Sequence, residues 1–273
     1  MNPRQSGLLP ILFISGALVV LVSFFYPESV LPRSLKYALP APFSYSYSYF
    51  PFLAAIVMSY FFARGFVSSH SVSLATLGVG SLVMGAGFLV PQIIVYLLPA
   101  SANELTGISS LVFLFSGILF TVFSTLRLVT SDRTASRPIG LLVLGYAGGL
   151  VLVGLVTVSA ASNILPPFFA PGKGPTLFRE EVLAVSIVLY TYSSLVIMRS
   201  YLGTRDDILY WFSLGLAATA LAFLGVLLGT FPGGPYSWLS RVSLVVGGFY
   251  FIAALRIAYK AVDSSRNIRA TTA

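Results

Sequence analysis

Long apolar runs separated by short polar breaks follow one another along the whole chain. Their length is close to the ~20 residues that an α-helix needs to cross a hydrocarbon core of ~30 Å. No stretch between them is large enough for a soluble domain. The pattern therefore predicts about eight transmembrane helices, at 7–26, 46–63, 72–98, 108–129, 138–161, 179–199, 207–229 and 237–258.

The first run, 7–26, is too long for the apolar part of a secretory signal peptide. No small-residue cleavage pattern follows it before Pro27, so we expect it to remain as a span. The predicted fold class is an all-α integral membrane protein, a single transmembrane domain over 1–260. A short polar cytoplasmic tail is expected over 261–273.

Composition agrees with a membrane protein. Apolar residues make up 57% of the chain and charged residues 9%, whereas soluble domains carry roughly 25% charged residues. The mean hydropathy is +0.91. The net charge of +8 would suit a nucleic-acid-binding protein, but the basic residues cluster at the ends of the apolar runs. That distribution orients a protein in a membrane, so we expect no nucleic-acid partner.

The basic residues also predict the orientation. With eight spans both termini lie on one side, and eleven of the sixteen basic residues fall on that side. Positive residues concentrate in the cytoplasm, which predicts a multi-pass protein of the cell membrane with both termini cytoplasmic. The remaining five are Arg33, Lys36, Lys173, Arg179 and Arg241.

Few residues here suit catalysis or cofactor binding. Cysteine is absent, and His70, in a short polar break, is the one histidine. The three lysines lie in loops or at span ends, which excludes a retinal-type Schiff base inside a span. No metal-ligand cluster, phosphate-binding loop or nucleophile elbow is visible. We therefore expect a protein that is not an enzyme, with no metal and no cofactor.

Candidate binding residues lie at the predicted outer rim. At 100° per residue, Arg179 heads a polar stripe on the sixth span that should face protein or water. Ser186, Tyr190 and Ser193 continue the stripe. The eighth span begins with a second aromatic and basic pair. The predicted ligand-binding residues are Arg179, Glu180, Tyr190, Trp238 and Arg241. The alternative is a structural ion pair between an arginine and a glutamate at the interface.

Two further features concern single spans. Pro91 and Gln92, near the outer end of the third span, predict a kink that is either a simple bend or the lining of a cavity. Thr204 with Asp207 resembles a capping box at the start of the seventh span, and its acids suit a helix N-terminus.

Small residues repeat at intervals of three and four along the seventh span. Such a seam lets another helix approach closely, within the chain or between copies. Membrane lipid is an expected partner, and a homo-oligomer would use this seam, which consists of Gly215, Ala218, Ala222, Gly225 and Gly229.

The last third of the chain resembles a known family. The motifs are Gly-Pro-Thr-Leu-Phe-Arg at 174–179, Leu-Tyr-Trp-Phe-Ser-Leu-Gly-Leu at 209–216, Trp-Leu-Ser-Arg at 238–241 and Gly-Gly-Phe-Tyr at 247–250. They are similar to the multi-spanning N-terminal membrane sensor modules of archaeal and bacterial PAS-type sensor histidine kinases. In that family, the resemblance implies, the helical bundle anchors and senses, and PAS and kinase domains beyond the last span carry the output. The residues given beyond the last predicted span are too few to form such domains, so we expect this chain to differ from the family in its output.

The resulting hypothesis is a sensor-like membrane protein. It would recognise a small or lipidic ligand at its outer rim and signal through a partner protein. Two alternatives remain, a non-catalytic structural subunit of a larger membrane complex and a transporter of an uncharged solute. An ionisable group at a span centre, typical of channels and proton-coupled carriers, is missing.

Overall fold

The computed structural model describes residues 14, 18, 46–97, 102–129, 138–170, 174–229 and 234–272. In this part of the chain, seven helices are long and apolar enough to cross a membrane. The fold is that of a multi-pass helical membrane protein. The helices are α3 (Ser46–Ser69), α4 (Val72–Leu97), α5 (Ala102–Val129), α6 (Pro138–Ala161), α7 (Leu177–Thr204), α8 (Asp207–Leu228) and α9 (Pro235–Thr272).

Seven of the eight predicted spans therefore have a helical counterpart. The first, 7–26, lies outside the described residues except for Ile14 and Leu18, which are helical. Helix α6 has the predicted limits. Helix α9 continues to Thr272, so the polar residues expected to form a tail extend the last helix instead. Hydropathy marks only the part of a helix that suits lipid, which explains why polar helical ends were missed.

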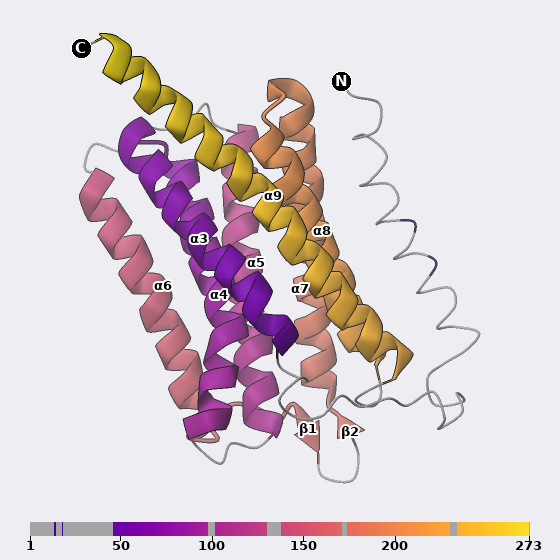
Figure 1. Ribbon diagram of the computed structural model, residues 1–273. Helices are drawn as coiled ribbons and strands as arrows, with labels where there is room; N and C mark the ends of the chain where they lie inside the picture. The colour runs from indigo at the N-terminus through magenta and orange to yellow at the C-terminus, as the bar shows by residue number, and fades with distance from the viewer. Residues whose placement is uncertain are drawn as a thin grey trace.

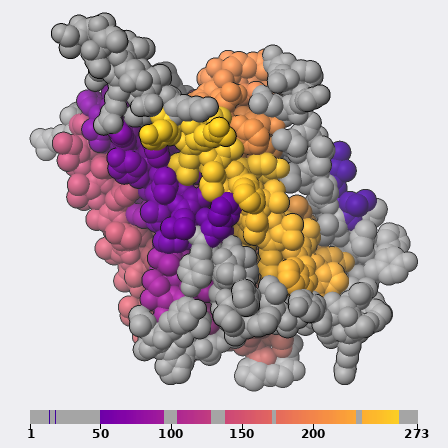
Figure 2. All heavy atoms as spheres, viewed as in Figure 1, coloured from indigo at the N-terminus to yellow at the C-terminus, as the bar shows by residue number. Residues whose placement is uncertain are grey.

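Six of the helices form a closed ring. In the order α3, α4, α5, α7, α8, α9, each packs against the next, and α9 packs against α3 (Figure 1). Figure 2 shows α3 and α9 side by side on one face of the molecule. Helix α6 stands outside the ring against α4 and α5, and most of its apolar side chains are exposed. This exposed apolar face suits contact with lipid or with another membrane helix.

Aromatic side chains fill the interior of the ring. Consecutive ring centroids lie 4.7–5.7 Å apart in tilted or edge-to-face geometry, the arrangement that aromatic pairs prefer. All of these side chains are buried. We call this chain of contacts the aromatic ladder; its members in order are Phe88, Phe113, Phe223, Tyr190, Phe120 and Phe212. The ladder leaves the centre of the bundle solid.

The predicted cytoplasmic turn between α7 and α8 differs from the expected capping box. Thr204 is the last residue of α7, and its hydroxyl donates to the carbonyl of Ser200. Arg205 adopts a left-handed conformation with φ 58° and caps α7. The N-cap of α8 is Asp206, whose carboxylate accepts from the amide of Ile208 at 3.0 Å. The expectation that an acid caps this helix is confirmed, but Thr204 as its cap was wrong.

A small β-hairpin closes the opposite end of the bundle. Strands β1 (Phe169–Ala170) and β2 (Gly174–Pro175) pair antiparallel at the end of the bundle away from the C-terminus (Figure 1). Just before β1, Phe168 is buried and lies beside Gly107 of α5. Thr176 ties the hairpin to α7, because its hydroxyl donates to the carbonyl of Pro167 and accepts from the amide of Arg179. The hairpin therefore holds the start of α7 in place.

The small-residue seam of α8 is covered within the chain. A Cβ on Gly215 would lie 2.3 Å from the ring of Phe251, and one on Gly225 2.7 Å from the carbonyl oxygen of Tyr236. Both contacts are made by α9, the helix that shares the closest packing with α8. The within-chain alternative for this seam is thus the one observed. A homo-oligomer through the same residues would require α9 to move away.

Candidate functional site

Arg179 is a buried cation near the start of α7. Its side chain is 4% exposed. One guanidinium nitrogen, Nη2, donates to the carbonyl of Val226 at 2.9 Å, and the guanidinium carbon lies 5.0 Å from the centroid of the Phe169 ring. Val226 belongs to the last turn of α8, where carbonyls lack a partner in their own helix and attract cations. Arg179 therefore caps α8 from a neighbouring helix.

The capping contact uses only part of the guanidinium. Nε and Nη1 of Arg179 are buried, and neither has a hydrogen-bond partner among the described residues. A buried charge needs paired hydrogen bonds to offset its lost hydration. Glu180 is exposed to solvent, and no ion pair joins it to Arg179 in the described part of the chain. Two guanidinium nitrogens of Arg179 are thus buried without a hydrogen bond in the described part of the chain.

The predicted polar stripe of α7 lies inside the protein. Ser186, Tyr190 and Ser193 are buried, as is Arg179. The Tyr190 hydroxyl hydrogen-bonds to Ser116 of α5, and Ser193 lies 3.2 Å from the hydroxyl of Thr121. The stripe therefore faces protein, one of the two surroundings that the sequence predicted. Its role over most of its length is to join α7 to α5.

Trp238 and Arg241 form a local pair at the start of α9. The guanidinium carbon of Arg241 lies 5.1 Å from the centroid of the Trp238 ring, a cation–π contact. Helix α8 packs against both α7 and α9 and stands between them. The site residues predicted on α7 and α9 therefore approach each other across α8 instead of directly.

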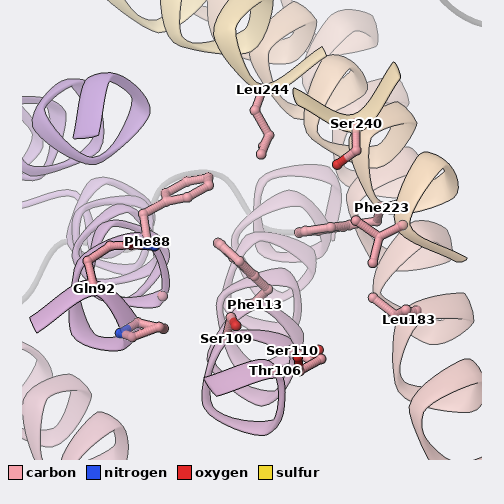
Figure 3. Close-up of a pocket in the computed structure, with 13 residues that line it drawn as sticks. Phe88, Gln92, Thr106, Ser109, Ser110, Phe113, Leu183, Phe223, Ser240 and Leu244 are labelled. Carbon is pink, nitrogen blue, oxygen red and sulfur yellow. The ribbon is translucent and has the colours of Figure 1, made fainter. Parts of the chain in front are cut away.

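A cavity of about 260 Å³ borders the aromatic ladder. It is lined by five of the six ring helices, as Figure 3 shows for Phe88 and Gln92 of α4, Phe113 of α5 and Leu183 of α7. Val226, which accepts from Arg179, also lines it. The remaining lining residues are Gly87, Pro91, Thr106, Ser109, Ser110, Phe223, Ser240 and Leu244. The first three rings of the ladder form the inner wall.

Pro91 and Gln92 line this cavity, so the cavity alternative for the third predicted span is the one observed. The side-chain oxygen of Gln92, Oε1, is buried and has no hydrogen-bond partner in the described part of the protein. The sequence marked Pro91 and Gln92 as a feature of one span, but it did not predict that they share a cavity with Val226, the hydrogen-bond partner of Arg179. The hydroxyls of Thr106, Ser109 and Ser110 were missed, because serine and threonine are common in packed membrane helices.

The site suits binding better than chemistry. Its walls combine aromatic rings with a few hydroxyl and amide groups, the usual make-up of a small-molecule pocket. No charged side chain lines it among the described residues, and Arg179 stands one helical turn from the lining residue Leu183. Of the predicted site residues, Tyr190 lies behind the inner wall, in edge contact with Phe223. Arg241 follows the lining residue Ser240.

No protein-family model, no curated protein and no solved structure matches this chain.

Proposed function

We propose that this protein is a membrane receptor, located in the cell membrane with its termini in the cytoplasm, that binds a small ligand in the cavity between α4, α5, α7, α8 and α9 and signals through a partner protein. The cavity is the observation that carries the proposal. Val226, whose carbonyl accepts from Arg179, lines it. Gln92 also lines it and has a buried amide oxygen without a hydrogen-bond partner in the described residues. Native interiors rarely leave such groups unsatisfied unless a ligand, ion or water completes them.

Helix α9 supplies a physical route from the cavity to the other side of the membrane. Ser240 and Leu244 line the cavity, and the same helix continues to Thr272. Its apolar span ends at Tyr259, so α9 projects about 20 Å further at 1.5 Å per residue. Figure 1 shows this end standing clear of the bundle. A ligand that shifts the cavity end of a continuous helix also shifts the projecting end.

The aromatic ladder favours a receptor over a transporter. A solute leaving the cavity inward meets Phe113, Phe223 and Tyr190, which pack ring to ring. Their separation would require rearranging the buried core of several helices at once. A receptor needs no such path, since its ligand enters and leaves from one side.

The test combines a ligand screen with a distance measurement. Thermal-shift screening of purified protein against lipids, quinones and small anionic metabolites should give a hit. Ser109→Phe, which fills the cavity, should abolish it. Because the chain has no cysteine, spin labels are placed at Thr204→Cys and Arg256→Cys, and the hit should change the distance between them. The pair Ser68→Cys and Thr204→Cys, which omits α9, is the control. The proposal is contradicted if the hits also bind the Ser109→Phe variant, or if they leave the distance between the labels at positions 204 and 256 unchanged.

A second candidate, a structural subunit, is favoured by the outer surface of α6. Gly140, Ala147, Gly154 and Ala161 recur every seven residues on its exposed side, and a Cβ on Gly140 or Gly154 would meet no atom within 4 Å. Small residues at this spacing permit close helix contact in a membrane. Mild-detergent pull-down should then recover a larger complex that Gly154→Leu disrupts. A monomer in both cases argues against the subunit.

A further inference from the structure

We infer that the ligand of the cavity is an uncharged, flat ring compound that dissolves in the membrane and carries oxygen atoms at opposite edges of its ring, as a 1,4-quinone does. This inference rests on the proposed receptor function and adds the chemical class of the ligand. Three properties of the cavity lining carry it. They are hydroxyl groups without a protein partner, a wall of aromatic rings, and the lack of a charged side chain among the described lining residues.

The polar part of the lining includes hydroxyl groups that are free to bind a ligand. Several buried serines of this bundle donate to a carbonyl four residues earlier, as Ser124 does to Phe120. The hydroxyls of Thr106, Ser110 and Ser240 make no hydrogen bond within the described part of the chain, and none of them is among its fully buried unpaired atoms. Because these residues line the cavity, their oxygens are accessible to a ligand there. A hydroxyl both donates and accepts, so each can meet a ligand oxygen.

These hydroxyls lie on two different walls of the cavity. Thr106 and Ser110 are four residues apart on α5 and so share one face of that helix, whereas Ser240 comes from α9. In Figure 3 they stand on opposite sides of the view, with Phe113 and Phe223 between them. A ring with one oxygen at each end would meet both walls at once. The placement therefore favours oxygens at opposite edges of the ligand over a single polar group.

An aromatic wall faces the body of the ligand. Phe88, Phe113 and Phe223 line the cavity, and their consecutive ring centroids lie 4.7 and 5.0 Å apart. Flat rings pack on such surfaces in offset or edge-to-face contact. The cavity of about 260 Å³ exceeds the ~150 Å³ that holds benzene. It is only partly enclosed, so a chain attached to the ring can extend out of it.

The charge of the ligand follows from the same lining. The polar lining residues in the described part of the chain are all neutral: Gln92, Thr106, Ser109, Ser110 and Ser240. An ion among them would lose its hydration without meeting an opposite charge, which is costly in an apolar site. Arg179 is not among the lining residues, so it does not supply that charge. An uncharged ligand fits this lining best.

The experiment compares matched probes on the full-length protein by calorimetry in detergent. The probes are 2-methyl-1,4-naphthoquinone (menadione), 2-methylnaphthalene, which lacks both oxygens, and 1,4-naphthoquinone-2-sulfonate, which adds a negative charge. Because the chain has no cysteine, the quinones form no thiol adduct with it. We expect menadione to bind roughly 10-fold more tightly than 2-methylnaphthalene, since it gains two hydrogen bonds. The sulfonate should bind roughly 10-fold more weakly than menadione. Menaquinone, which adds an isoprenoid chain to the menadione ring, should bind at least as tightly as menadione.

Two variants assign the preference for oxygens to residues. Ser110→Ala and Ser240→Ala each remove a hydroxyl from one wall. Each should weaken the binding of menadione roughly 2- to 10-fold and leave the binding of 2-methylnaphthalene unchanged. Ser124→Ala is the matched control, because it makes the same change on α5 outside the cavity lining. It should alter the binding of neither probe.

The possible outcomes separate this inference from the receptor proposal. Equal binding of menadione and 2-methylnaphthalene, or no binding of any probe, overturns the inference and leaves the receptor proposal to the ligand screen. Tighter binding of the sulfonate than of menadione overturns the assignment of an uncharged ligand. Binding of menadione without binding of menaquinone overturns the membrane as its source. If Ser109→Phe leaves menadione binding unchanged, the cavity is not the site, and both proposals fail.

Discussion

At the scale of single residues, the hydroxyl of Tyr190 depends on one partner. Ser116 also donates to the carbonyl of Phe113 at 2.9 Å, so its one proton is used and Tyr190 is the donor in their shared hydrogen bond. Both side chains are fully buried. Removing the acceptor leaves a buried hydroxyl unsatisfied, whereas removing the tyrosine hydroxyl leaves Ser116 with its carbonyl.

We therefore predict that Ser116→Ala destabilises the protein by about 1–3 kcal/mol and Tyr190→Phe by about 1 kcal/mol or less. The double variant should cost no more than Ser116→Ala alone, because no hydroxyl remains to be satisfied. Unfolding in detergent measures all three. Tyr192→Phe is the matched control, since Tyr192 is exposed and its hydrogen bond to Thr125 is long, 3.4 Å. A larger effect from Tyr190→Phe than from Ser116→Ala would show that the assigned donor is wrong.

The polar stripe that begins at Arg179 shows which features of a site residue spacing can predict and which it cannot. Angular position on an α-helix follows from residue spacing alone, and the four predicted stripe residues are all buried. The partners of Arg179, Tyr190 and Ser193 belong to α8 and α5, dozens of residues away in the chain. No spacing rule within α7 identifies those partners. The predicted pairing of Arg179 with a glutamate could not be decided from the sequence for the same reason.

At the scale of helices, two glycines that both lie within apolar helical segments differ in how closely other atoms approach them. Gly225 faces the backbone of α9, with the amide nitrogen of Ser240 2.8 Å from a would-be Cβ. Gly154 of α6 has open space around it. Glycine destabilises a helix by roughly 0.5–1 kcal/mol relative to alanine. It therefore favours stability only where a close neighbour leaves no room for a methyl group.

Gly225→Ala should accordingly destabilise the protein by about 1–3 kcal/mol, because α8 and α9 must separate to admit the methyl group. Gly154→Ala should be neutral or stabilise by up to ~1 kcal/mol. Thermal unfolding of the two variants in the same detergent provides the comparison. Equal losses from both would mean that α6 is covered by a partner in the purified sample.

At the scale of the whole molecule, the described turns fall into two groups at opposite ends of the bundle. The α3–α4 turn, the α7–α8 turn and the projecting end of α9 lie at one end of the bundle, and the β-hairpin lies at the other (Figure 1). The positive-inside rule assigns the first end to the cytoplasm. The cavity residues Pro91 and Gln92, near the far end of α4, then lie in the outer half of the membrane.

Single cysteines test this orientation without background labelling. In intact cells, a membrane-impermeant maleimide should label Ser162→Cys, directly after α6, and should spare Ser68→Cys until the membrane is permeabilised. Both serines are exposed, so accessibility within the protein is matched. Labelling of Ser68→Cys in intact cells would reverse the assigned orientation, and the ligand would then enter from the cytoplasm.

The spans, their approximate limits, the burial of the α7 stripe and a cavity as one of two readings for Pro91 could all be obtained from the chain itself. Each depends on composition or on helical periodicity, which are local. Only the tertiary structure shows the closed ring, the covering of the α8 seam by α9, and the hairpin. It also shows that Gln92 lines the same cavity as Val226, the residue that accepts from Arg179. Lipid and protein interior are almost equally apolar, so hydrophobic pattern does not reveal which face of a membrane helix meets another helix. That choice depends on shape complementarity between distant segments, and it is what creates the cavity.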